Sequence, residues 1–187
     1  MTNFTIESAT PVPVLKTERL LLRGAVASDF EDSAAMWGDP EVVRHIGGQT
    51  RDRQDAWFTL CRMRGMWDLV GLGNWTVCDR MTGEFYGEIG LADFMRGMTP
   101  DISGVPEAGW AYARHAHGRG IATQALQAVL DWSDQTRKSS RIVCIIDEDH
   151  IASHRVAAKC GFQFVTNTEY RGSPVQLLER NMTSQSG

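Results

Sequence analysis

The chain has 187 residues, 42% of them hydrophobic, and a formal net charge of −4. This length and composition predict one globular domain over residues 1–187, with a sizeable core. The acidic balance speaks against a nucleic-acid-binding protein, because such proteins usually carry a basic excess. We also expect no membrane partner, since no apolar run reaches the length of a membrane span.

The chain ends and the cysteines indicate the compartment. Residues 1–14 contain two prolines and are expected to be extended, without the basic region and apolar core of a secretory signal. Residues 182–187 are expected to form a frayed tail. The four cysteines lie far apart and form no C-x-x-C pair, which favours reduced thiols over disulfides. Together these features predict a cytoplasmic protein.

Apolar spacing and turn residues predict the secondary structure along the chain. The expected elements are a strand at 19–23, a helix at 29–37 capped by Ser28 or Asp29, a short helix from Pro40, a helix at 52–67, strands at 74–78 and 84–91, a loop at 95–106, a strand at 107–112, a helix at 120–136, a strand at 141–146, a helix at 151–160, and strands at 162–165 and 175–178. This order predicts an α+β fold in which a mixed sheet carries helices on both faces. It lacks the strand–helix alternation of a Rossmann domain.

Two glycines, Gly118 and Gly120, lie between an expected strand and an expected amphipathic helix. Glycines let backbone N–H groups approach a ligand closely, because no Cβ stands in the way. The start of a helix adds unpaired N–H groups and the positive end of the helix dipole. The turn therefore predicts a site for phosphate or pyrophosphate.

Four motifs around this turn identify a family. They are FYGEIGL at 85–91, EAGW at 107–110, HGRGIATQA at 117–125 and SHRVAAKCGF at 153–162. In this order and with these gaps they resemble the GCN5-related N-acetyltransferases, in particular the branch of the ribosomal-protein N-terminal acetyltransferases. The resemblance covers residues 16–180. It implies that family's fold, a central, mostly antiparallel twisted sheet with helices on both faces.

The resemblance also implies a reaction and a donor. Family members transfer an acetyl group from acetyl-CoA to a primary amine, which attacks the thioester directly and needs no metal. The implied acceptor here is a protein N-terminus or a small-molecule amine. Three positions depart from the family pattern: His115 replaces Gln or Arg, Gln124 replaces a frequent Glu, and His150 replaces a frequent Asn.

The family pattern implies which residues contact the donor. Backbone N–H groups from His117 to Ala122 are expected to hold the pyrophosphate. The full set of expected donor contacts is Trp110, Ala111, Tyr112, His117, Gly118, Arg119, Gly120, Ile121, Ala122, His150, Ser153 and Arg155. Arginine side chains suit phosphate oxygens, although Arg119 and Arg155 could equally be solvated charges near helix ends.

Two carboxylates and one hydroxyl are the expected catalytic groups. Glu107 resembles the position from which family members use a glutamate as base, and partial burial would raise its pKa toward a useful value. Glu88, on the neighbouring strand, is the second choice. Either could instead be a surface charge or an ion-pair partner. Ser153 could protonate the leaving thiolate, or it could simply cap a helix.

The remaining polar and aromatic patterns are weaker. The pairs His115-x-His117 and His150-x-x-x-His154 lack a further ligand, so we expect no metal site. Most of the aromatic residues are expected in the core, while Trp110 and Phe94 are candidates for an acceptor pocket. The Gly- and Pro-containing loop 95–106 suits a substrate-facing position or a plain connection.

Two other functions stay open from the sequence. The first is a non-catalytic acyl-CoA-binding or sensor domain with the same fold, which the three departures keep possible. The second is a nucleotide-binding domain, which the absence of G-x-x-x-x-G-K-[ST] makes weaker. The sequence does not distinguish a monomer from a homodimer.

Overall fold

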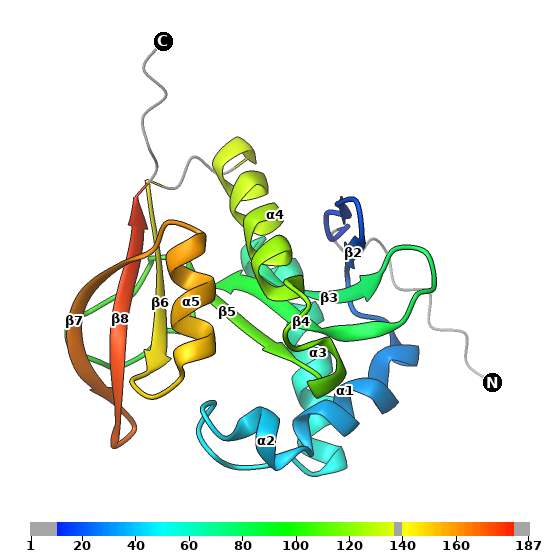
Figure 1. Ribbon diagram of the computed structural model, residues 1–187, viewed down its shortest axis with the longest axis horizontal. Helices are drawn as coiled ribbons and strands as arrows, with labels where there is room; N and C mark the ends of the chain where they lie inside the picture. The colour runs from blue at the N-terminus through cyan, green and yellow to red at the C-terminus, as the bar shows by residue number, and fades with distance from the viewer. Residues whose placement is uncertain (1–10, 137–139, 182–187) are drawn as a thin grey trace.

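The computed structural model describes residues 11–136 and 140–181 (Figure 1). Its elements are β1 (Leu15–Lys16), β2 (Leu20–Arg23), η1 (Ala27–Asp29), α1 (Phe30–Trp37), α2 (Pro40–Val43), α3 (Arg53–Val70), β3 (Gly73–Asp79), β4 (Phe85–Ala92), β5 (Glu107–Tyr112), η2 (Arg114–Ala116), α4 (Ile121–Thr136), β6 (Arg141–Asp147), α5 (Ile151–Lys159), β7 (Gln163–Tyr170) and β8 (Ser173–Asn181). The expected tail at 182–187 and the first ten residues of the extended segment lie outside the described residues.

The strands form one eight-stranded sheet in the order β1-β2-β3-β4-β5-β6-β8-β7. Every neighbouring pair is antiparallel except β5 and β6, which are parallel. Each residue of the central strand β4 is buried. The predicted class, a mostly antiparallel mixed sheet with helices, is confirmed.

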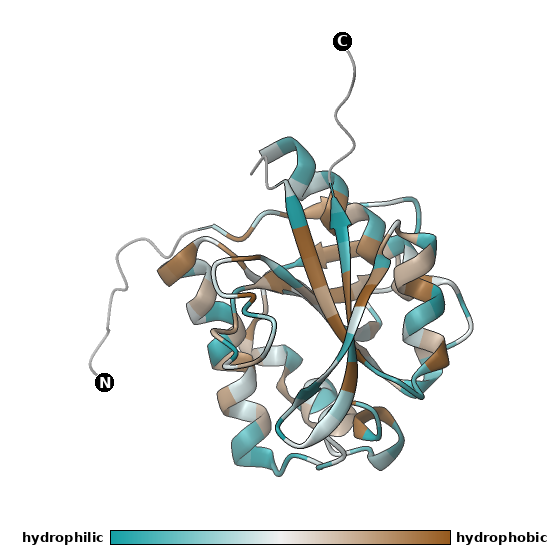
Figure 2. Ribbon diagram, turned by 90° about the vertical axis from the view of Figure 1, so that its left-hand side faces the viewer, coloured by the Kyte–Doolittle hydropathy of each residue, from teal (hydrophilic) through white to brown (hydrophobic). Residues whose placement is uncertain are grey.

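The largest core cluster lies between the sheet and the helices α3 and α4. The predicted stripe of α3, Ala56, Leu60, Met63 and Trp67, is buried. Trp67, Trp75 and Trp132 pack edge to face, with ring centroids 4.6 to 5.7 Å apart. Figure 2 shows hydrophobic residues concentrated along the inner strands and hydrophilic residues over much of the surrounding helices. Burial of these apolar faces is what holds the helices on the sheet.

Helix ends follow local chemistry. Asp39 and Asp52 accept hydrogen bonds from the first turns of α2 and α3, and Gly161, with φ +85°, follows the end of α5 as predicted. Asp29 stands at the N-cap position of α1, one of the two expected, but without the expected cap bond. Its buried carboxylate instead pairs with the Arg23 guanidinium at 2.7 and 2.8 Å.

The closing hairpin is longer than predicted. The strands β7 and β8 extend well past the expected 162–165 and 175–178 and pair as far as Tyr170↔Ser173. Most residues of β7 are exposed, so no apolar run marks the strand in the sequence.

Two further observations bear on the expected compartment. All four cysteines are free thiols, and only Cys61 is exposed. Within residues 11–136 and 140–181, no helix combines the length and the apolarity that crossing a membrane requires.

Candidate active site

The parallel pair β5 and β6 opens into a gap toward the carboxyl ends of the strands. Their only register pair is Glu107↔Val143, and Figure 1 shows the two strands pointing apart beyond it. Backbone groups on the β6 side of Gly109 to Tyr112 therefore have no strand partner. A gap of this kind can accept an extended ligand that hydrogen-bonds to the strand, as another strand would.

The predicted phosphate turn follows the end of β5, the strand on one side of this gap. After β5 and η2, Gly118 and Gly120 adopt φ of +72° and +75°, which glycine reaches without strain. Among the described residues, no backbone carbonyl accepts a hydrogen bond from the N–H groups of 118–120. A Cβ on Gly118 would meet nothing within 4 Å. The turn is thus an open cradle of free donors at the start of α4, and it fits a pyrophosphate.

One predicted donor of the turn is already used. The His117 N–H donates to the Arg114 carbonyl at 3.1 Å. Its ring Nε2 lies 2.9 Å from the Tyr112 carbonyl, while the Tyr112 side chain is buried in the core. His117 and Tyr112 therefore hold the turn against the end of β5, and their expected role as direct donor contacts stays a prediction.

The other side of the turn is held by side chains. Arg19, the residue before β2, donates from Nε to Gln124 Oε1 at 3.2 Å and from Nη1 to the Arg119 carbonyl at 3.3 Å. The Arg119 guanidinium donates to the Tyr86 hydroxyl at 3.0 Å and lies over its ring. Sequence reasoning missed Arg19, because nothing in the local pattern shows that it reaches a turn 100 residues away.

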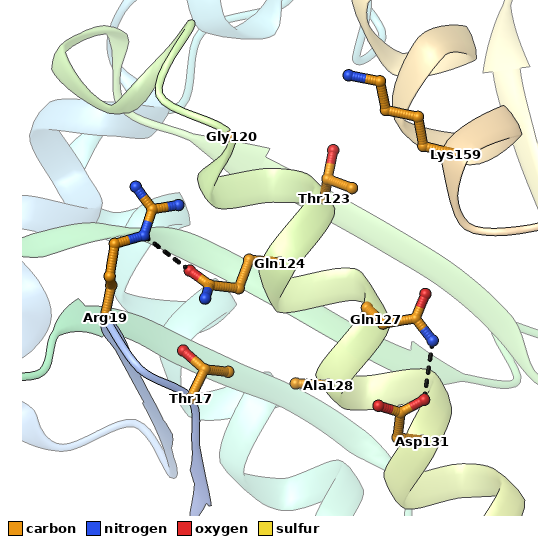
Figure 3. Close-up of a pocket in the computed structure, with 9 residues that line it drawn as sticks. All are labelled: Thr17, Arg19, Gly120, Thr123, Gln124, Gln127, Ala128, Asp131 and Lys159. Atoms are coloured by element: carbon orange, nitrogen blue, oxygen red, sulfur yellow. Dashed lines mark hydrogen bonds between the residues drawn. The ribbon is translucent and has the colours of Figure 1, made fainter.

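A pocket of about 550 Å³ continues from the turn along α4. Figure 3 shows Arg19 and Lys159 on opposite sides of the first turns of this helix. The lining residues are Thr17, Arg19, Gly120, Thr123, Gln124, Gln127, Ala128, Asp131 and Lys159. Two cations beside a phosphate cradle are suited to further phosphate groups of a nucleotide. Arg155, also predicted to contact phosphate, is exposed on the neighbouring helix α5.

Ser153 faces the gap from α5. Its hydroxyl accepts a hydrogen bond from Trp110 Nε1 of β5 at 3.1 Å, which joins α5 to β5 through two of the expected donor contacts. The residue at the N-cap of α5 is His150. Ser153 lies one turn inside the helix, which removes the simple reading of Ser153 as a cap.

Glu107 is buried and paired. The carboxylate is only 3% exposed and accepts two bonds from Arg96, at 2.6 and 2.8 Å. Burial raises the pKa of Glu107, and Arg96 opposes that shift. The Arg96 guanidinium also lies over the rings of Phe94 and Tyr170. Phe94 thus supports this ion pair from the loop that precedes β5.

Glu88 lies on the same face of the sheet as Glu107, since Glu88↔Ala111 and Ala92↔Glu107 are register pairs. Four residues of strand separate them, roughly 13 Å along the strand. Glu88 accepts hydrogen bonds from Ser33 Oγ at 2.7 Å and Trp37 Nε1 at 3.0 Å. Burial raises the pKa of its carboxyl.

Glycine separates the two carboxylates. Gly90 and Gly109 pair between them, and a Cβ on Gly109 would meet nothing within 4 Å. The structure therefore places both predicted bases along one face of β4 and β5, with open space at Gly109, but gives each its own hydrogen-bond partners.

The histidine pairs form no metal centre in the described part of the chain, where no group of three or more His, Cys, Asp or Glu side chains could hold an ion. Instead, His115 Nε2 lies 2.9 Å from the Phe85 carbonyl, and His154 Nε2 lies 3.1 Å from the Asp147 carbonyl. Each ring bonds to a backbone carbonyl, and His115 Nε2 also lies 3.6 Å from Glu84 Oε1.

Comparison with known proteins decides the family. The family model described as an acetyltransferase (GNAT) domain matches residues 19–163. The chain belongs to the GNAT acetyltransferases. A GnaT-family acetyltransferase from Bordetella pertussis is 34% identical, with a TM-score of 0.79 over 90% of this chain and 99% of that one. The matched span of this GNAT protein contains the gap, the glycine turn and Ser153.

Two solved structures with CoA share the fold at lower identity. Spermidine N-acetyltransferase from Vibrio cholerae, in complex with CoA and spermine, is 14% identical, with a TM-score of 0.69 over 88% of this chain and 96% of that one. RimL, a ribosomal L7/L12 α-N-protein acetyltransferase in complex with CoA, is 15% identical, with a TM-score of 0.74 over 91% and 98%. At such identities the likeness shows the common fold alone.

Proposed function

We propose that this GNAT protein transfers the acetyl group of acetyl-CoA to a primary amine, either a protein N-terminus or a small-molecule amine, by direct attack of the amine on the thioester. The observation that carries the proposal is the gap between β5 and β6, which leads to the open glycine cradle at Gly118 and Gly120. An extended ligand ending in a pyrophosphate matches both parts.

The donor side of the reaction needs binding and orientation. Acetyl-CoA supplies an already activated acyl group, so the protein must hold it and exclude competing water. Free N–H groups of 118–120 bind the pyrophosphate, with Ile121 and Ala122 at the helix start. Backbone groups of Trp110 and Ala111 accompany the extended arm, and His150 and Arg155 border it. The Ser153 hydroxyl gives a proton to the leaving thiolate, and its bond from Trp110 supports this role by fixing the oxygen.

The acceptor side needs deprotonation of an ammonium group. Glu107 is the base expected from the sequence. Both of its oxygens are bonded to Arg96, so it can act as the base only if that ion pair opens. The carboxylate must exchange a guanidinium for the incoming ammonium. Glu88 is the second hypothesis and would have to part from Ser33 and Trp37.

The test is turnover. The protein is incubated with acetyl-CoA and a panel containing spermidine, free amino acids and peptides with an open N-terminus, and released thiol is measured. Thiol release that depends on the amine supports the proposal. Tight CoA binding without turnover on any amine contradicts it, and favours the non-catalytic acyl-CoA-binding alternative.

A substitution of Glu107 tests its predicted role as the general base. If Glu107 deprotonates the acceptor, Glu107→Gln lowers turnover strongly and leaves CoA affinity nearly unchanged, because the carboxylate is remote from the glycine cradle. An unaffected rate removes Glu107 from this role.

A further inference from the structure

A third titratable group lies at the mouth of the gap. His45 follows α2, and its ring stacks on that of His150, with centroids 4.5 Å apart and planes inclined by 13°. His45 Nδ1 lies 3.1 Å from Oδ1 of Asp147, the last residue of β6. These two contacts connect the segment after α2 with the strand and the helix that border the donor gap.

The position of α2 brings His45 to the same face as the two carboxylates. Val42 and Val43 of α2 belong to the core cluster that contains Trp37 and Ala111. Trp37 contacts Glu88, and Ala111 is the register partner of Glu88. His45 therefore follows a helix that packs on the carboxylate face of β4 and β5, and its own ring contacts the end of β6 and the start of α5.

Asp147 prepares His45 to act as a base. An ionised carboxylate can only accept, so Nδ1 must donate the hydrogen bond to Oδ1. That tautomer leaves the lone pair on Nε2, as in other histidines that a carboxylate orients. No described residue bonds to Nε2, and the His45 side chain is 26% exposed, so both an amine and water can reach it.

The neighbouring charged groups favour this role. The ring of His45 faces Asp147 from β6 and His150 from α5, and His150 in turn feels the charges of His154 and of His117 from the glycine turn. Burial, followed by the charge of His45, lowers the pKa of His150 to about 4. His150 is therefore neutral near pH 7, and His154 bonds the Asp147 carbonyl instead of its carboxylate.

Glu107 and Glu88 are less available. Arg96 occupies both oxygens of Glu107, and Ser33 and Trp37 occupy those of Glu88. We propose that His45, oriented by Asp147, is the base that takes the proton of the acceptor's ammonium group. This inference rests on the proposed acetyl transfer.

The step balances in protons and bonds. Nε2 of His45 accepts one proton from the ammonium, and the freed nitrogen lone pair forms the C–N bond with the thioester carbonyl carbon. The C–S bond breaks, and its electron pair leaves on sulfur. A second nitrogen proton reaches the thiolate through the Ser153 hydroxyl, and the His45 imidazolium releases its proton to water. Ammonium and thioester become amide, thiol and one free proton.

Four variants of the full chain test the role. His45→Gln removes the base and Asp147→Asn removes the carboxylate that positions it. Arg44→Gln and Asp149→Asn are the matched controls, because Arg44 is an exposed neighbour of His45 and Asp149 contacts Asp147 only through its backbone N–H. For each, turnover of the amine that the wild type acetylates fastest is measured against pH, together with CoA affinity and thermal unfolding.

The expected results differ between the two positions. His45→Gln lowers kcat about 100-fold, the scale of a lost general base, and abolishes the decline of activity toward acidic pH. Asp147→Asn lowers kcat less, because the Nε2 base is kept but loses the carboxylate that orients its ring. CoA affinity stays within about twofold, and the controls behave like the wild type.

Three outcomes overturn the inference. His45→Gln with wild-type kcat and an unchanged acidic decline shows that His45 is not the base. If that variant fails to fold, an Asp147→Asn variant with wild-type kcat has the same meaning. A wild type that binds CoA but acetylates no amine overturns the proposed function, and this inference with it.

Discussion

The donor side of this GNAT protein is formed by backbone groups, whereas its carboxylate face is formed by side chains. The donor side is backbone: a gap between two strands and a turn whose glycines leave N–H groups free. The carboxylate face consists of side chains, and each of its charges has a partner, Glu107 with Arg96 and Glu88 with Ser33 and Trp37. Backbone recognition depends on a short local pattern, whereas paired side chains depend on residues far away in the sequence.

Removing a partner on the carboxylate face should have the largest effect. Arg96→Met leaves the buried Glu107 charge without its counter-ion, and we expect a loss of about 3 kcal/mol in the free energy of unfolding. Arg53→Met is the control, because Arg53 makes the same two-bond contact to Glu31 on the surface, where water screens the charges and a much smaller loss is expected. Chemical denaturation at neutral pH measures both.

The loss in the free energy of unfolding caused by Arg96→Met should depend on pH. Arg96 lowers the pKa of Glu107 against the effect of burial, so without it the carboxyl holds its proton to higher pH. Acidification neutralises the buried charge, and the difference from wild type should shrink. Equal losses in Arg96→Met and Arg53→Met at all pH values would contradict the contrast between a buried and a surface ion pair.

On the donor side, a side chain in the cradle should weaken binding, and the accompanying backbone strain is shared by its control. Gly118→Val places a branched side chain where a Cβ now meets nothing, and we expect CoA affinity to fall about 100-fold, or about 2.7 kcal/mol. The positive φ also strains the variant. Gly83→Val is the control, since Gly83 has φ +78° in an exposed turn. Calorimetric titration with CoA should show normal affinity for that control.

Loss of the Ser153 hydroxyl should affect the chemical step more than stability. Ser153→Ala removes the proton path to the thiolate, and we expect kcat to fall about tenfold, at the low end of acid–base effects. The unfolding temperature should fall only modestly, because Trp110 Nε1 loses its acceptor while the N-cap position of α5 belongs to His150. A large fall in the unfolding temperature with unchanged kcat would make Ser153 a structural residue.

Replacing the buried carboxyl by its amide should have the smallest effect at neutral pH. Burial raises the pKa of Glu88 above the usual 4.5, so the folded state binds more protons than the unfolded state above that pH. The contribution of Glu88 to the free energy of unfolding therefore falls as pH rises. Glu88→Gln removes this slope, and we expect its stability at pH 7 to lie within about 1 kcal/mol of wild type.

Denaturation of Glu88→Gln between acidic and neutral pH measures the slope. Its stability relative to wild type should improve as the pH rises. A relative stability that worsens with pH would mean that the folded protein prefers the ionised form of Glu88, and that its partners outweigh burial.

Much of this molecule could be predicted from local sequence. The stripe of α3, the hairpin β3–β4 and the glycine after α5 follow from apolar spacing and turn chemistry within a few residues. The glycine turn and Ser153 belong to motifs with a set spacing, so they identified the family and the donor side together. The strands β7 and β8 were underestimated, because an exposed strand has no apolar run to mark it.

The tertiary structure determined which side chains pair with the charged groups of the site. Nothing near Glu107 in the sequence says that Arg96 will occupy its carboxylate, and nothing near Gly118 points to Arg19. His45 and Asp147 meet across 102 positions, and only the packing of α2 against the sheet makes them a pair. By itself, the sequence determined the fold class and the backbone cradle, because both follow from short-range patterns. Which charges are paired and which remain free depends on contacts that only the folded chain creates.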